Sequence, residues 1–127
     1  MGAFSGVTAS LLLLAVAIFQ VAVILGAPVG RFTQGGQHEG KLPMGNRALA
    51  AISMLLLLAM SATVSGKIGR GPFVSLSSGV LATVWWITVF YLLVGVVMNL
   101  ASRSKQERLL FAPLTTIILV LVLTSAA

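Results

Sequence analysis

The stretch FSGVTASLLLLAVAIFQVAVILGA, which runs from Phe4 to Ala27, decides the fold because it contains no charged residue. A helix needs about 20 mostly apolar residues to cross the hydrocarbon core of a bilayer, and this stretch is long enough. A cleaved signal peptide is disfavoured, since no basic segment precedes the stretch and its apolar run is long. We therefore expect a retained membrane-spanning helix.

Three further apolar stretches could span a membrane: Ala48 to Gly66, Val74 to Ala101 and Leu109 to Ala127. The chain is 58% hydrophobic and only 8% charged, whereas about a quarter of the residues in soluble domains are charged. Backbone groups in lipid must be satisfied within the chain, which favours helices, and strand alternation is absent. The sequence predicts an all-α polytopic membrane protein, with residues 1–127 forming one antiparallel four-transmembrane-helix bundle.

Lysine and arginine are distributed unevenly over the three connections. The first holds Arg31, Lys41 and Arg47, the second holds Lys67 and Arg70, and the third holds Arg103, Lys105 and Arg108. The positive-inside rule then places the first and third connections in the cytoplasm and both termini outside. We expect a multi-pass protein of the cell inner membrane, with the lipid bilayer as its partner. The net charge of +6 needs no nucleic acid to explain it.

Small and polar residues follow one face of each of the first three spans, as in helices that pack closely in lipid. Ordinary bundle packing explains this pattern, and a polar path through a homo-oligomer is the alternative. The predicted rows are Gly6, Ser10, Leu13, Ala17 and Gln20 in the first span; Ala48, Ala51, Leu55, Ala59, Ala62 and Gly66 in the second; and Gly79, Thr83, Thr88, Tyr91, Gly95, Asn99 and Ser102 in the third.

Residues for catalysis and metal binding are scarce. The chain has no cysteine or aspartate, and His38 is its single histidine. A zinc site usually needs three or four protein ligands, and His38, Glu39 and Glu107 are the candidates that the sequence offers. We predict no metal, no cofactor and no catalytic residue, which disfavours an enzyme but leaves the question open.

The stretch from Gly26 to Arg47, here called the first loop, is rich in glycine and longer than most connections. It could fold back over the bundle, form an anion-binding nest beside Arg31, or serve only as a linker. Ser104 is predicted to cap the fourth helix, with Glu107 at the spacing of a capping box.

We expect a cytoplasmic polar cluster in which Glu107 and Asn99 hold the first loop through Arg31 or Arg47. An acid near the membrane interface seldom stays unpaired, and Arg108 is a further partner. The cluster comprises Arg31, His38, Glu39, Arg47, Asn99, Glu107 and Arg108, with His38 and Glu39 at its rim.

The segments GAPVGRFTQGGQHEGKLP (residues 26–43), with Arg47, and NLASRSKQERLLFAP (residues 99–113) resemble a group of small four-helix bacterial inner-membrane proteins. Those proteins carry a similar glycine-rich first loop ending in Leu-Pro and a similar Ser-x-x-Glu-Arg before the fourth helix. An aromatic residue precedes their Gly-Gly pair, whereas Gln34 stands there in this chain. The resemblance implies the architecture and no mechanism.

Three classes of function follow. The favoured class is an accessory or structural membrane protein that binds a partner through a polar cytoplasmic loop cluster. The second is an oligomeric channel or transporter for a small neutral or anionic solute, although the spans lack the ionisable residues of a proton relay. The third is a membrane enzyme that acts on lipid headgroups.

Overall fold

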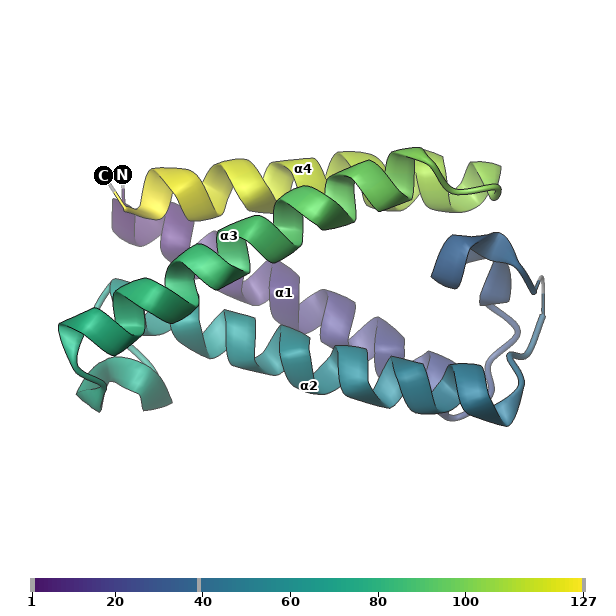
Figure 1. Cartoon of the computed structure of the whole chain (residues 1–127), viewed down its shortest axis with the longest axis horizontal. Coiled ribbons are helices and arrows are strands. Elements are labelled where there is room, and N and C mark those ends of the chain that lie inside the picture. The colour runs from purple at the N-terminus through teal and green to yellow at the C-terminus, as the bar shows by residue number, and fades with distance from the viewer. Residues whose placement is uncertain (1, 39, 127) are drawn as a thin grey trace.

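The computed structural model describes residues 2–38 and 40–126. The described residues form four long helices and three short 3-10 turns, and contain no strand. In chain order these are α1 (Gly2–Ile24), η1 (Gly30–Phe32), η2 (Gln34–Gly36), α2 (Met44–Lys67), η3 (Pro72–Ser75), α3 (Ser78–Leu100) and α4 (Lys105–Ser125) (Figure 1). The predicted all-α four-helix bundle is confirmed.

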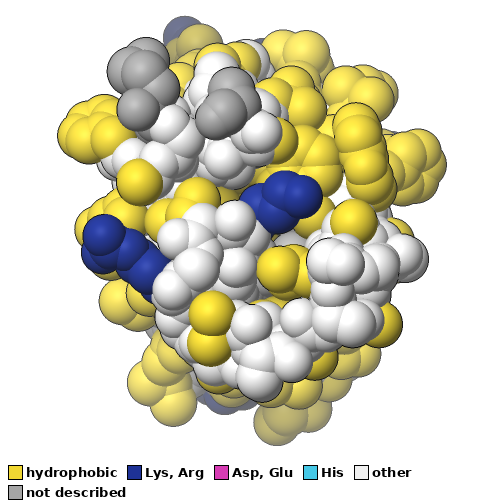
Figure 2. Space-filling model, turned by 90° about the vertical axis from the view of Figure 1, so that its left-hand side faces the viewer, with side chains coloured by type: hydrophobic (Ala, Val, Ile, Leu, Met, Phe, Trp, Pro, Cys, Tyr) yellow, Lys and Arg dark blue, Asp and Glu magenta, His cyan; other side chains and the backbone are white. Residues whose placement is uncertain are grey.

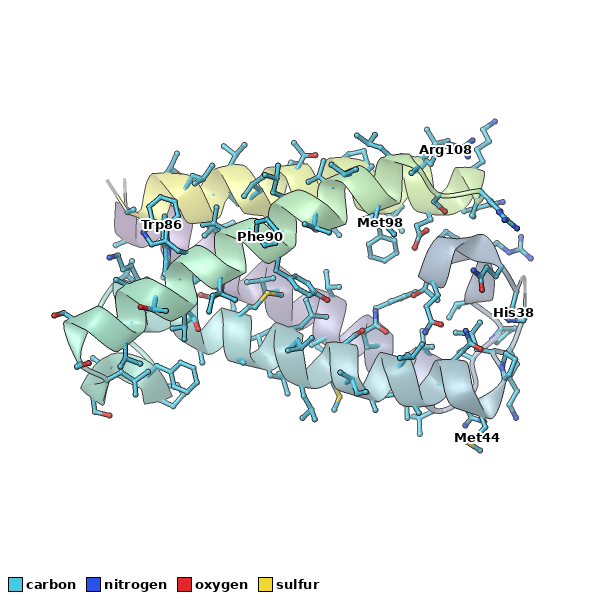
Figure 3. All side chains as sticks on the ribbon, in the orientation of Figure 1. His38, Met44, Trp86, Phe90, Met98 and Arg108 are labelled. Atoms are coloured by element: carbon cyan, nitrogen blue, oxygen red, sulfur yellow. The ribbon has the colours of Figure 1, made fainter. Side chains whose placement is uncertain are left out.

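All four helices are long and apolar enough to cross a membrane. The outer faces carry large apolar side chains, and Trp86, Phe90 and Met98 point away from the bundle along α3, each more than 60% exposed (Figure 3). A soluble monomer seldom exposes so much contiguous apolar surface, whereas lipid tails cover it at no cost. The chain is therefore an integral, multi-pass membrane protein.

The helices run antiparallel, and α1 packs against both α2 and α4 while α3 packs mainly against α4. Figure 1 shows the two chain ends close together, at the same end of the bundle as the α2–α3 connection. The α1–α2 and α3–α4 pairs diverge toward the opposite end, where η1 and η2 lie (Figure 1). The first loop and the α3–α4 connection share the end where the helix pairs separate (Figure 1). At the other end, with the chain termini, the charged side chains visible in Figure 2 are basic.

The face of α1 that packs inside the bundle is the one predicted from its small and polar residues. Ser10, Leu13, Ala17 and Gln20 are all buried, as is Gly6. This part of the prediction is confirmed.

The row predicted for α2 is mostly wrong. Leu55 is 62% exposed, whereas Leu57, Met60 and Val64 are buried. Small and large apolar residues occur on every face of α2, and either kind can lie against lipid. Small residues alone therefore do not identify the packed face.

Three serines link α1 to α2 inside the bundle. Ser61 Oγ donates to the Ser10 carbonyl at 3.0 Å, Ser10 Oγ donates to the Ser61 carbonyl at 3.3 Å, and Ser65 Oγ donates to Ser10 Oγ at 2.9 Å. Each bond is worth about 0.6 kcal/mol in a membrane protein, and the reciprocal pair fixes how the two helices align.

Serine side chains also mark where two helices begin. Ser77 Oγ accepts a hydrogen bond from the Val80 N–H at 3.3 Å, so α3 begins at Ser78, later than its apolar stretch. Ser104 Oγ accepts from the Glu107 N–H at 3.3 Å, which confirms the predicted cap of α4. Bonds of this kind satisfy amide groups that a helix start leaves without a partner.

Candidate functional site

The first loop closes on itself. The Gly30 N–H donates to the Gly40 carbonyl at 2.9 Å, which brings the two halves of the loop together. A Cβ atom on Gly30 would overlap the carbonyl oxygens of His38 and Gly40. This crossing therefore requires glycine, because only glycine allows the two backbones to approach so closely.

The loop docks onto the beginning of α4. The Gly35 N–H donates to Glu107 Oε1 at 3.2 Å, and Ser104 Oγ donates to the Arg31 carbonyl. Gly36 has a φ of +69°, and a Cβ atom there would overlap Ser104. The first loop is thus held over the bundle by contacts that depend on its glycines.

A second set of contacts ties the loop to α2. Gln34 Nε2 donates to the Asn46 carbonyl, and Asn46 Nδ2 donates to Gln34 Oε1, both at 2.7 Å. The Arg47 guanidinium donates to the Ile24 carbonyl at 2.8 and 2.6 Å and so caps the end of α1. The first loop is therefore folded back over the bundle, which is one of the alternatives drawn from the sequence.

The predicted polar cluster is only partly assembled. Glu107 does contact the first loop, but through the Gly35 amide, and it forms no ion pair with a Lys or Arg of residues 2–38 and 40–126. Arg47 is engaged by Ile24, as described above. Arg108 Nη1 donates to the Ser102 carbonyl at 2.7 Å.

Of the other members of the predicted cluster, those that the structure describes make no hydrogen bond to the Glu107 carboxylate. Asn99 Nδ2 donates to Thr115 Oγ1 at 2.9 Å and to the Phe111 carbonyl at 3.3 Å, so it joins α3 to α4 and does not hold the loop. Arg31 is exposed, and the partly exposed His38 lies at the loop end of the bundle (Figure 3). Glu39 lies outside the described residues.

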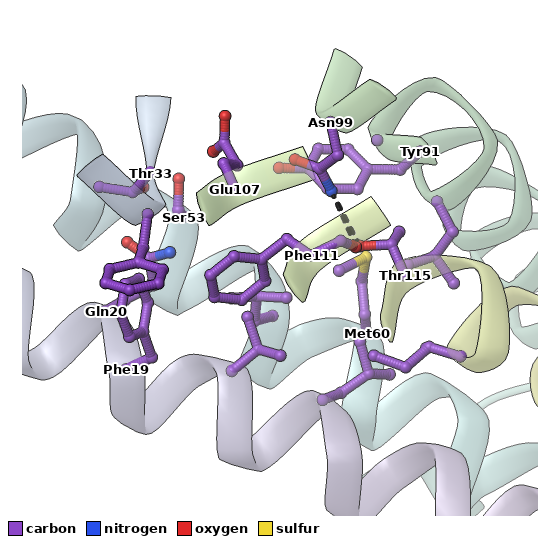
Figure 4. Close-up of a pocket in the computed structure, with 17 residues that line it drawn as sticks. Phe19, Gln20, Thr33, Ser53, Met60, Tyr91, Asn99, Glu107, Phe111 and Thr115 are labelled. Carbon is purple, nitrogen blue, oxygen red and sulfur yellow. Dashed lines mark hydrogen bonds between the residues drawn. The ribbon is translucent and has the colours of Figure 1, made fainter. Parts of the chain in front are cut away.

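Beneath the first loop, the diverging helix pairs border a partly open cavity of about 170 Å³. All four helices and the loop contribute to its walls (Figure 4). Its polar lining comes from Gln20, Thr33, Ser53, Tyr91, Asn99, Glu107 and Thr115, and its apolar lining from Leu13, Val16, Phe19, Phe32, Leu57, Met60, Leu92, Gly95, Phe111 and Ile118.

Two of these polar side chains stand out by their burial and lack of partners. Gln20 is 9% exposed, and its amide makes no hydrogen bond to the described residues. Glu107 is 6% exposed, and its Oε2 atom likewise has no hydrogen-bond donor among them. In Figure 4, Glu107 lies between Thr33 and Asn99, and Gln20 lies beside Thr33. Neither group is among the fully buried unpartnered atoms of the described residues, where Trp85 Nε1 is the one such atom, so both keep access to the cavity and can bond a ligand there.

The lining offers binding groups but no catalytic pair. Glu107 is its one charged residue, and no histidine, lysine or arginine is among the described lining residues. Among the described residues, no three His, Cys, Asp or Glu side chains lie close enough to hold a metal ion together. Acid–base or nucleophilic catalysis normally needs a second titratable group within hydrogen-bond reach, and the Glu107 carboxylate makes no hydrogen bond to Tyr91, the other titratable residue of the described lining.

Sequence reasoning identified Asn99 and Glu107 as site residues and placed Gln20 on the packed face of the first span. It missed Thr33 and Ser53 as members of the site. The signal that could have found Ser53 is a polar residue within an otherwise apolar helical run, which in lipid points inward.

Comparisons of this chain with protein-family models, with curated proteins and with solved structures give no match.

Proposed function

We propose that this chain is an accessory membrane protein that binds an amphipathic molecule in the cavity beneath its first loop. The observation that carries the proposal is that Gln20, a residue only 9% exposed whose amide makes no hydrogen bond to the described residues, lines the same cavity as the buried Glu107. A cavity lined by both polar and apolar side chains fits a ligand with a polar head and an apolar body.

The proposal includes the membrane in which the protein lies and its orientation there. Six basic residues, Arg31, Lys41, Arg47, Arg103, Lys105 and Arg108, lie in the first and third connections, against Lys67 and Arg70 in the second. We propose the cell inner membrane as its location, and the distribution favours an orientation with the first loop in the cytoplasm. The part of the cavity beneath the first loop would then lie near the cytoplasmic interface, where amphipathic molecules place their heads.

A channel is less well supported than a binding site. Beyond the cavity, the bundle interior is filled by an apolar core that includes Ala9, Val64, Trp85 and Val122. A pore through a single bundle would have to cross this apolar layer. An enzyme is less well supported because the lining has a single carboxylate and no base beside it.

The test is native mass spectrometry of protein purified in mild detergent. We expect a molecule to be retained on the wild-type protein and lost from Ser53→Phe, because Ser53 lines the cavity and a phenylalanine would fill it. The matched control is Leu55→Phe on the same helix, where the side chain is 62% exposed and faces away from the core. Retention that is equal in Ser53→Phe and in wild type would refute the proposal.

A further inference from the structure

We infer that the cavity receives the ammonium group of an amphipathic molecule, with the Glu107 carboxylate as counter-charge and the Gln20 carbonyl as a second acceptor. The inference rests on the proposed function and names the class of ligand.

The first argument is the charge of the site. Glu107 is the one charged residue of the lining and is 6% exposed. Its Oε1 atom accepts the Gly35 N–H, and no Lys or Arg of the described residues pairs with it. The first turn of α4, where Glu107 lies, and the Gly35 amide both favour the carboxylate, but neither brings a full positive charge, which a bound cation would supply.

The second argument is the direction of the nearby arginines. Arg47 is bound to the Ile24 carbonyl, and Arg108 is bound to the Ser102 carbonyl. Neither is among the cavity-lining residues. An anionic ligand inside the cavity would therefore meet the Glu107 carboxylate without a cationic group to bind it, whereas an ammonium would be attracted.

The third argument is the aromatic lining. Phe19, Phe32, Tyr91 and Phe111 all border the cavity, and the rings of Phe19 and Phe111 lie 5.1 Å apart at an angle of 54°. Aromatic faces attract ammonium groups most strongly where water is excluded. The same rings pack against methylene groups, so they suit the carbons next to an ammonium as well as the charge.

The size of the cavity limits how much of the ligand it holds. At about 170 Å³ it has room for an ammonium head with a few carbon atoms, so a longer tail must extend into the surrounding lipid. Two sources share this chemistry: the primary amine of a lipid headgroup such as phosphatidylethanolamine, and a free alkylammonium compound.

The experiment compares three probes of equal chain length on wild-type protein in phosphatidylcholine nanodiscs: decylammonium, decanol and decyl sulfate. We expect decylammonium to bind roughly 10- to 100-fold more tightly than decanol, the range for a hydrogen bond to a charged group, and decyl sulfate to bind most weakly. Equal binding of all three probes would overturn the inference but leave the proposed cavity standing. Binding of none would refute both.

Variants then locate the effect. Glu107→Gln should lose the preference for decylammonium over decanol while still binding decanol. Glu39→Gln removes the same charge from the other acidic residue of the chain and should keep the preference. Equal loss in both variants would attribute the preference to net charge and overturn the inference. If Glu107→Gln does not fold, the comparison of the three probes on wild type decides the matter alone.

Replacing part of the phosphatidylcholine with phosphatidylethanolamine distinguishes the two sources. Weaker decylammonium binding in those nanodiscs would show that the lipid amine competes for the site. Unchanged binding would assign the site to free alkylammonium compounds.

Discussion

Replacing Gly36 with alanine tests whether the first loop is docked onto α4. Gly36 has a φ of +69°, and the added Cβ would overlap the Ser104 Cβ and lie 3.0 Å from the Ser104 nitrogen. The left-handed backbone costs an alanine about 1–2 kcal/mol. Relieving the overlap requires the loop to move away from α4. That movement endangers the Gly35–Glu107 bond, worth about 1.5–3 kcal/mol, and the Ser104–Arg31 bond, worth about 0.5–1.5 kcal/mol.

Gly35→Ala is the matched control for this change. Gly35 also has a positive φ, +75°, but a Cβ atom there would meet nothing within 4 Å. Its N–H would remain to donate to Glu107. We expect Gly35→Ala to lower the free energy of unfolding by about 1–2 kcal/mol, which is the conformational cost alone.

The comparison of the two variants gives a defined result. The loss in free energy of unfolding should be larger for Gly36→Ala than for Gly35→Ala by up to about 4.5 kcal/mol, the sum of the two docking bonds. The assay is unfolding by sodium dodecyl sulfate in mixed micelles, and far-ultraviolet circular dichroism monitors the loss of helix. If both variants lose the same stability, the loop is not docked against Ser104 and the cavity has no lid.

Three other outcomes are expected, the first from the distribution of Lys and Arg and the other two from the structure. Single cysteines introduced by Gln37→Cys and Lys105→Cys should be shielded from an impermeant thiol reagent in intact cells, whereas Gly71→Cys should react; the opposite pattern would invert the orientation. Asn99→Leu should lower the free energy of unfolding by about 0.6–2 kcal/mol, because it removes the hydrogen bonds that the Asn99 side chain donates from α3 to α4. Ser61→Ala should cost about 0.6 kcal/mol by removing its bond to α1, and no measurable loss would show that the serine link is not formed.

Much of the fold could be predicted because hydropathy and capping act locally. The uncharged stretch from Phe4 predicted α1, and the Ser104 cap predicted the start of α4. Helix ends that extend into polar residues were harder to predict from the sequence. Met44 begins α2 although Asn46 and Arg47 are polar, since a helix continues beyond its apolar part where the backbone bonds are still available.

The candidate site was harder to predict because it depends on contacts between distant segments. Glu107 was expected to find an arginine, but the positive φ of Gly35 and Gly36 turns a backbone amide toward it instead. Gln20 and Ser53 face one cavity only because the helix pairs diverge. The spacing of residues in the sequence predicts neither the loop conformation nor the angle between the helix pairs.

The central claim is that the cavity holds an amphipathic molecule with its polar group between Gln20 and Glu107. The most direct test is a crystal structure of the protein purified in mild detergent and grown from a lipidic mesophase, without added ligand. Our account predicts non-protein density within hydrogen-bond distance of the Gln20 amide and the Glu107 carboxylate, beneath the docked first loop. A collapsed cavity, with the Gln20 amide hydrogen-bonded to a protein group and no such density, would contradict it.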